Sequence, residues 1–350
     1  MDALTHAIVG ATLAQLPRSR SNNKQGIITW QKRIIIGASA ALFPDIDYLL
    51  FFINPLDFLA YWHRAETHSL LLAPLWAWLI MQSWQRLSRW QLPTQLLYGL
   101  CLLALISHPL LDSLTTFGTQ WFAPVSRYPV TFNLLFVIDA YFSGIVLCTL
   151  LLVIVLNQQV MKLLVLLLPC CYLLLVINIK HEIEQSVSAV HQPITLLPQP
   201  FSPLYWQAII PTEDGFAQAY IKQGDDQIAQ WVSSTMGLQQ QSANYQLHEQ
   251  LQWQNHNTLP TQTKIKRPAL QVWQHPKFKA FQRFSTYPIF YDYQHTAQQT
   301  CVWFSDLRYH WPNISPSFRY GMCRQNQDAN LQTWQLQRMK YFSKQQVTLK

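Results

Sequence analysis

Long runs of apolar residues dominate the first half of the chain. They cover residues 34–53, 69–84, 92–114, 134–156 and 160–179. A helix rises 1.5 Å per residue, so about 20 residues cross a bilayer. Four of the runs are long enough, and 69–84 is short. The pattern therefore predicts five membrane crossings, with a shorter apolar helix over 3–16 that is inserted only partway.

The second half has a different pattern. Short alternating runs at 270–273, 288–293, 300–309 and 317–322 are separated by Pro, Asn and Gly, which favours a mainly antiparallel sheet. We therefore predict an α-helical polytopic membrane domain over 1–189, followed by a mainly β (α+β) soluble domain over 190–350. Cys301 and Cys323 lie in two of the predicted strands, and spacing alone leaves open whether they pair in an oxidising compartment.

Composition supports the membrane assignment. The 350 residues are 50% hydrophobic and 12% charged, whereas soluble domains carry about 25% charged residues. The net charge is +8, but the basic residues form no stripe, so nothing points to a nucleic-acid partner. The six cysteines include no CxxC pair, which excludes a zinc finger. The positive charge instead suits a protein beside anionic lipid.

The distribution of Lys and Arg between the runs predicts the orientation of the chain. Basic residues concentrate in the first, third and fifth connections: Arg18, Arg20, Lys24, Lys32, Arg33, Arg86, Arg89 and Lys162. The second and fourth connections hold only Arg64 and Arg127. Because Lys and Arg are retained in the cytoplasm, we expect a multi-pass protein of the bacterial inner membrane with a periplasmic C-terminal domain.

Ionisable residues interrupt the apolar half at several points. A charged group at mid-bilayer costs at least about 2.5 kcal/mol, so such residues mark candidate sites. Pro44 breaks the helix just before two acids, which should line a protein-enclosed cavity. His108 and Asp112 share a helix face, as do Asp2 and His6. The other interrupting residues are Asp45, Asp47, His63, His68 and Asp139.

In the predicted topology these groups lie at one depth, near the outer surface. Imidazoles and carboxylates without thiolates form the ligand set of a hydrolytic zinc or manganese centre. Other interpretations exist for single residues. His6 alone also fits a hydrogen-bonded structural residue, and His108 with Asp112 also fits a polar pair that joins helices.

The order of these residues resembles a known family, the membrane-bound metal-dependent hydrolases described as LexA-binding and inner-membrane-associated. The matching segments are MDALTHAIVG, FPDID, HRAETHS, HPLLDSLTTFGTQ, PVS and VIDA, in order over about the first 150 residues. Two positions depart from the family pattern, since Ala65 replaces a usual Gly and Ala140 replaces a common Pro.

The resemblance implies a metal site, with zinc as the first choice, manganese or magnesium as alternatives, and one or two ions. It also implies a LexA-type protein partner. The implied ligands are His6, Asp45, Asp47, His63, His68, His108 and Asp112, with Asp139 as an eighth candidate.

The leading hypothesis is a metal-dependent hydrolase that cleaves a phosphoester or related bond of a membrane lipid, a lipid-linked molecule or a periplasmic substrate. Arg64 is a candidate phosphate clamp, although an interfacial Arg that extends to lipid headgroups fits equally. Glu66 is a candidate general base or an acceptor for a ligating His.

Two hypotheses of other classes compete with the enzyme. An ion- or proton-coupled carrier predicts polar residues that continue across the bilayer, whereas here they gather towards one side. A non-catalytic scaffold predicts a metal that only joins helices and has a filled coordination shell.

Overall fold

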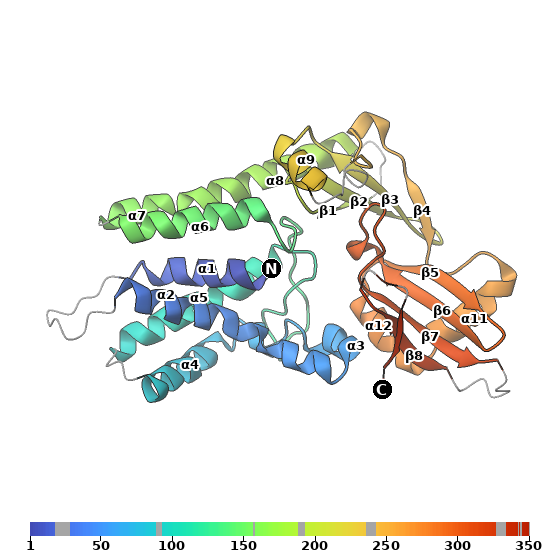
Figure 1. Ribbon diagram of the computed structural model, residues 1–350, viewed down its shortest axis with the longest axis horizontal. Helices are drawn as coiled ribbons and strands as arrows, with labels where there is room; N and C mark the ends of the chain where they lie inside the picture. The colour runs from blue at the N-terminus through green and yellow to red at the C-terminus, as the bar shows by residue number, and fades with distance from the viewer. Residues whose placement is uncertain are drawn as a thin grey trace. The chain divides into compact units, whose positions relative to one another are not determined.

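The structure is a computed structural model (Figure 1). It describes residues 1–17, 29–88, 93–156, 158–187, 193–235, 243–326, 334–341, 343 and 345–349. Contacts divide the chain into two compact units, Met1–Leu49 with Trp62–Lys180, and Leu50–Tyr61 with His181–Lys350. The first unit is helical and the second contains two antiparallel sheets, which confirms the predicted fold class. The predicted boundary between residues 189 and 190 lies outside the described residues.

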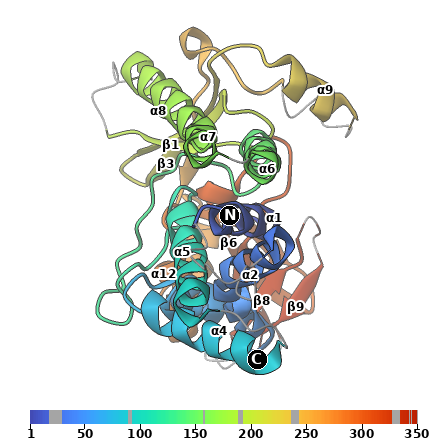
Figure 2. The same cartoon turned by 90° about the vertical axis from the view of Figure 1, so that its left-hand side faces the viewer.

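The first unit is built from apolar helices. Figure 1 shows α1, α2, α5 and α4 side by side, and Figure 2 shows the same helices closer to end-on. Small and aliphatic residues, including Ala40, Ala104 and Leu100, fill the space between them. The helices are α1 (Ala3–Ala14), α2 (Trp30–Leu42), α4 (Ala73–Leu87), α5 (Thr94–Ser113), α6 (Ala140–Val155), α7 (Gln159–Val165) and α8 (Leu167–Val187).

The described helices differ from the five predicted crossings. Among them, three segments are long and apolar enough to span a membrane: Trp30–Phe52, Thr94–Ser113 and Gln159–Val187. The predicted run 69–84 becomes α4, which starts only at Ala73. The predicted run 134–156 becomes α6, which starts only after Asp139 because that carboxylate accepts a hydrogen bond from the Phe142 amide and caps the helix. Both helices are therefore shorter than the apolar runs that contain them.

Helices α1 and α2 approach each other through small residues. A Cβ atom on Gly10 would overlap the Ala41 Cβ and the Gly37 carbonyl, and one on Gly37 would overlap the Gly10 carbonyl and the Ala14 Cβ. Small residues allow two helix backbones to pack this closely in a membrane. This contact fixes α1, and with it His6, against α2.

The second unit contains two antiparallel sheets, as the alternating pattern predicted. The first has the order β1-β2-β3-β4 and the second the order β5-β6-β7-β8-β9. Aromatic residues of the helical segments, such as Phe278 and Phe281, pack against Phe304 of the second sheet. The strands are β1 (Thr195–Pro198), β2 (Tyr205–Pro211), β3 (Gly215–Lys222), β4 (Gln254–Asn257), β5 (Pro288–His295), β6 (Gln299–Asp306), β7 (Arg319–Gln325), β8 (Gln335–Met339) and β9 (Gln346–Thr348), and the helices are α9 (Gln227–Thr235), α11 (Thr263–Trp273) and α12 (Lys279–Phe284).

The segment Leu50–Tyr61 belongs to the second unit although it follows the span Trp30–Phe52. It contains the short helix α3 (Pro55–Asp57), which contacts α12. Arg283 donates from Nε to the Ala60 carbonyl at 3.1 Å, and the Arg338 guanidinium lies 5.4 Å from the centre of the Phe51 ring. The segment is therefore packed into the second unit by side chains from two of its elements.

Cys301 of β6 and Cys323 of β7 lie directly opposite each other and form a disulfide. The other cysteines, Cys101, Cys148, Cys170 and Cys171, are free. Unfolded protein treated with a maleimide tag is therefore expected to gain four tags, and six after reduction. Six tags without reduction in protein from the native membrane would show that the pair does not form there. Cys301→Ser should lower the free energy of unfolding by about 2–4 kcal/mol.

His310 predicts acid sensitivity in the second unit. Its Nε2 hydrogen-bonds Ser305 Oγ at 2.9 Å. Burial lowers the pKa of His310 to about 3, with His256 and Arg319 lowering it and Asp306 raising it. An unfolded His titrates near 6.5, so the unfolded chain binds the proton first, and stability should fall as pH drops from about 6.5 towards 3.

The slope from this one group approaches about 1.4 kcal/mol per pH unit. Chemical unfolding at pH 7 and pH 4.5 should therefore show a smaller pH effect in His310→Gln than in the wild type. An equal pH effect in both proteins would contradict the assignment of this slope to His310.

Candidate metal centre

Two buried imidazoles face each other at the centre of the first unit. Nε2 of His68 and Nε2 of His108 are 3.1 Å apart. Nδ1 of His108 donates to the Ala41 carbonyl at 2.5 Å. Nδ1 of His68 hydrogen-bonds Thr67 Oγ1 at 2.9 Å and lies 3.6 Å from Asp47 Oδ2. These acceptors place the proton of each neutral ring on Nδ1, so both Nε2 lone pairs point to the same place.

Two carboxylate oxygens approach the same place. Asp45 Oδ1 lies 3.7 Å from His68 Nε2 and 3.5 Å from His108 Nε2. Asp112 Oδ2 lies 3.4 Å and 3.3 Å from the same two nitrogens. Ligands about 2.0–2.2 Å from one tetrahedral ion lie roughly 3.3–3.6 Å from each other. The spacing of these four atoms therefore fits a small divalent cation.

The surroundings of Asp112 support this fit. Its Oδ1 accepts from His6 Nε2 at 3.1 Å and from Arg64 Nη2 at 2.9 Å, and it also contacts the amino group of Met1. Its Oδ2 is buried and has no hydrogen-bond partner. A buried, unpartnered carboxylate oxygen is costly, and a cation between it and the two Nε2 atoms would satisfy it.

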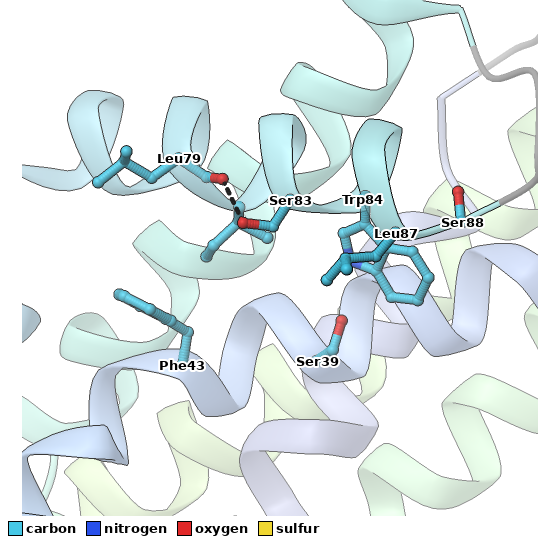
Figure 3. Close-up of a pocket in the computed structure, with 8 residues that line it drawn as sticks. Ser39, Phe43, Leu79, Ser83, Trp84, Leu87 and Ser88 are labelled. Atoms are coloured by element: carbon cyan, nitrogen blue, oxygen red, sulfur yellow. Dashed lines mark hydrogen bonds between the residues drawn. The ribbon is translucent and has the colours of Figure 1, made fainter.

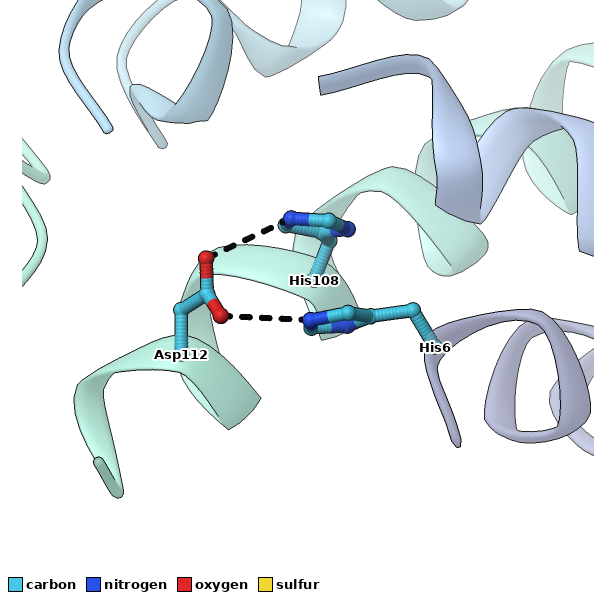
Figure 4. Close-up of side chains that lie close together, drawn as sticks. All are labelled: His6, His108 and Asp112. Atoms are coloured by element: carbon cyan, nitrogen blue, oxygen red, sulfur yellow. Dashed lines mark hydrogen bonds and ion pairs between the residues drawn. The ribbon is translucent and has the colours of Figure 1, made fainter. Parts of the chain in front are cut away.

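Figure 4 shows how His6, His108 and Asp112 are arranged. The rings of His6 and His108 stack with their centres 3.6 Å apart, and both lie against the Asp112 carboxylate. His108 and Asp112 come from successive turns of α5, and His6 comes from α1. The predicted i, i+4 pair therefore does share one helix face, and α1 completes the group.

Pro44 accounts for the position of the two acids on α2. At Phe43 the α-helix gives way to a 3-10 helix, Phe43–Phe52, as expected where a proline removes a backbone donor. Asp45 and Asp47 lie in the first turns of this segment. Asp45 points to the two Nε2 atoms, whereas Asp47 reaches the loop that carries His63.

Asp47 holds that loop rather than the four-atom centre. Its Oδ2 accepts from His63 Nδ1 at 3.2 Å and from the Arg64 amide at 3.0 Å. Burial lowers the pKa of His63, so the ring is neutral near pH 7. Asp47 and His63 therefore lie behind His68, where they orient the loop and the ring.

Arg64 occupies a place that neither sequence interpretation predicted. It is buried, and Nη1 donates to the Asp112 carbonyl at 3.2 Å and to Thr115 Oγ1 at 2.9 Å. Its backbone has a φ of 54°, in the left-handed region. With Nη2 on Asp112 Oδ1, the guanidinium fixes the carboxylate and does not extend to lipid headgroups. Thr115 and the Ala41 carbonyl were missed, because neither carries a pattern that the sequence displays.

The structure does not bring Glu66 or Asp139 to the centre. The Glu66 carboxylate is 41% exposed and forms an ion pair with Arg127, so its carboxylate charge is already paired outside the centre. Asp139 caps α6 and accepts from the Tyr172 hydroxyl at 3.0 Å. An acid directly before a helix start is an N-cap pattern, and this signal could have excluded Asp139 from the predicted ligands.

Among the described residues, two groups offer His or carboxylate atoms close enough together to hold a metal ion. One is His6, His108 and Asp112, and the other is Asp45, His68 and His108. The groups share His108, so they form one connected cluster. Asp47, His63 and Asp139, which were also predicted as ligands, belong to neither group.

Comparisons with known proteins place the chain in a family. No curated protein and no solved structure matched it. The sequence model of the YdjM inner membrane protein family matches residues 1–183, which include all residues of the cluster. The family and the long apolar helices agree on a location in the inner membrane. Because the match covers more than half of the 350 residues, the chain belongs to the YdjM inner membrane protein family.

Proposed function

We propose that this protein is an inner-membrane hydrolase that depends on one divalent metal ion. Four residues would hold the ion: Asp45, His68, His108 and Asp112. The observation that carries the proposal is the buried pair of facing Nε2 atoms beside the unpartnered Asp112 Oδ2. Without a cation these groups would be destabilising, because lone pairs would face each other in a site that excludes water.

One ion fits this cluster better than two. His108 belongs to both candidate groups, and its Nδ1 already bonds the Ala41 carbonyl, so only Nε2 remains to bind a metal. Two nitrogen and two oxygen ligands suit zinc, with manganese as the next choice and magnesium, which prefers oxygen ligands, after it. When bound, the ion would supply Lewis-acid activation of water and of the scissile group.

The exposure of the ligands supports an enzyme over a scaffold. His68, His108 and Asp112 are buried, whereas the Asp45 side chain is 23% exposed. A structural metal site is closed on all sides, and a catalytic one keeps an accessible position. Substrate would therefore approach beside Asp45, while Arg64 and His6 hold Asp112 in place from the opposite oxygen.

We propose a phosphoester or related bond as the substrate bond, since mixed His and Asp ligand sets suit phosphoryl chemistry. Arg64 is bonded to Asp112 and Thr115, so its role in this proposal is to position Asp112 and not to clamp the phosphate. Glu66 has no part in the proposal, because it is paired with Arg127.

The proposal also places the C-terminal unit in the periplasm. The Cys301–Cys323 disulfide supports this placement, because disulfides persist in oxidising compartments. In this topology a LexA-type partner would meet only the cytoplasmic connections. Several basic residues of those connections lie outside the described residues: Arg18, Arg20, Lys24 and Arg89.

Elemental analysis of the purified full-length protein tests the metal site directly. About one zinc or manganese ion per chain is expected in the wild type, with loss in His68→Ala and Asp112→Ala. His181→Ala is the matched control, because His181 is exposed on α8 and hydrogen-bonds only Gln185 among the contacts described. Unchanged metal content in both site variants would overturn the proposal.

A further inference from the structure

A cavity of about 520 Å³ lies between α2 and α4 of the first unit. Figure 3 shows Phe43 of α2 facing the side of α4 that carries Leu79, Trp84 and Leu87. Ser39 and Ser83 also line the cavity. The metal centre uses none of these side chains.

The serines do not make the cavity polar. Ser39 Oγ donates to the Ile36 carbonyl at 3.0 Å, and Ser83 Oγ donates to the Leu79 carbonyl at 2.9 Å. Both hydroxyl protons are thus used within the helices that carry them. A ligand in the cavity would meet mainly carbon atoms from Phe43, Leu79 and Trp84, which favours an apolar occupant.

The cavity is joined to the metal centre through α2. Phe43 lines the cavity, and two residues later Asp45 reaches the centre. On the cavity side of Phe43, the Ala41 carbonyl holds His108. Helix α4 starts soon after His68, and the cavity residues 79–87 lie roughly 9–21 Å along that helix from its start, at 1.5 Å per residue. This range is comparable with half of the roughly 30 Å hydrocarbon core of a bilayer.

The lining is continuous with the apolar outer surface of the helices. Leu79 and Leu87 line the cavity and are also 38% and 85% exposed. Trp78 and Leu75 extend the same exposed apolar surface along α4. In an inner-membrane protein this surface meets lipid chains, so the occupant that reaches the cavity without crossing water is a lipid chain.

We infer that the cavity takes one hydrocarbon chain of a phospholipid whose phosphoester lies at the metal centre. The inference rests on the proposed function and names its substrate class as a membrane phospholipid. In the reaction a water oxygen forms a bond to phosphorus, the ester P–O bond breaks, and the leaving oxygen takes up the proton that the water loses. The hydrocarbon chain itself would only position the lipid.

Photolabelling tests the cavity. The probe is phosphatidylglycerol with a diazirine in one acyl chain, added to the purified full-length protein in detergent. Label is expected on residues 39–43 and 79–87, and Ser83→Trp, which fills the cavity, should reduce it at least tenfold. Gly99→Leu is the control, because a Cβ on Gly99 meets no atom within 4 Å. Label that is spread evenly over α6 and α8, or that Ser83→Trp does not reduce, would overturn the inference.

Hydrolysis separates this inference from the proposed function. Rates are measured on long-chain phosphatidylglycerol and on bis(p-nitrophenyl) phosphate, a water-soluble diester. Ser83→Trp should lower the ratio of the long-chain rate to the soluble rate at least tenfold, and Gly99→Leu should keep it. Site-specific label without hydrolysis of either diester would sink the proposed function and keep the cavity as a lipid-chain site. Hydrolysis without specific label would do the reverse.

Discussion

His108→Ala is expected to abolish metal-dependent hydrolysis. The variant loses the Nε2 atom that lies within 3.5 Å of the other three candidate ligands. Loss of a residue that only orients a ligand costs about 10–100-fold in metal affinity or activity, so loss of a ligand should exceed about 100-fold. The measurement is hydrolysis of bis(p-nitrophenyl) phosphate by protein that has been treated with EDTA and then resupplied with zinc or manganese.

The wild type should lose activity with EDTA and recover it with metal, whereas His108→Ala should not recover. His181→Ala serves as the control for replacement of an imidazole at an exposed position. Near-infrared or circular-dichroism spectra are not needed to interpret a failure, because size-exclusion chromatography of His108→Ala already tests whether the variant is folded. Activity in folded His108→Ala that equals the wild type would contradict the centre described above.

Gly37→Val is expected to prevent stable assembly of the first unit. The new side chain would overlap the Gly10 carbonyl and the Ala14 Cβ, and these belong to a helix that cannot move without taking His6 with it. Overpacking costs typically 1–3 kcal/mol and more where backbone atoms are in the way, so we expect a loss of more than about 3 kcal/mol.

Thermal stability in detergent measures this effect, with Gly99→Val as the matched control. Gly99 also lies in a membrane helix, but a Cβ there meets no neighbouring atom. The control should stay close to the wild type in melting temperature and in metal content. A melting temperature of Gly37→Val equal to that of the control would show that α1 and α2 do not pack as closely as described.

The sequence predicted the fold class and the members of the cluster better than their roles. His68, His108, Asp45 and Asp112 come together because their spacing on α5 and beside Pro44 already limits where they can point. Their partners were not predictable in the same way. The Ala41 carbonyl is a backbone atom, and a side-chain pattern carries no information about which carbonyl an imidazole will meet.

The wrong predictions have physical causes that a pattern of apolar runs does not contain. Asp139 was taken as a ligand because it interrupts such a run, but it interrupts the run where a helix begins. Glu66 was taken as a base because it lies between two histidines, yet its carboxylate turns outward to Arg127. The five predicted crossings assumed that each apolar run is helical throughout, and two of those runs are helical over only part of their length.

The path of the chain limits how the protein can be divided. The chain leaves the first unit after Leu49, returns at Trp62 and leaves again after Lys180, so three peptide connections join the two units. A fragment that ends at Lys180 would keep Leu56 and Phe58, which are fully buried in the complete protein, but would lose Arg283 and Arg338. Such a fragment would expose apolar rings beside the loop that carries His63. Deleting the C-terminal part is therefore not a neutral trimming, and loss of activity in the fragment would say nothing about whether that part binds substrate.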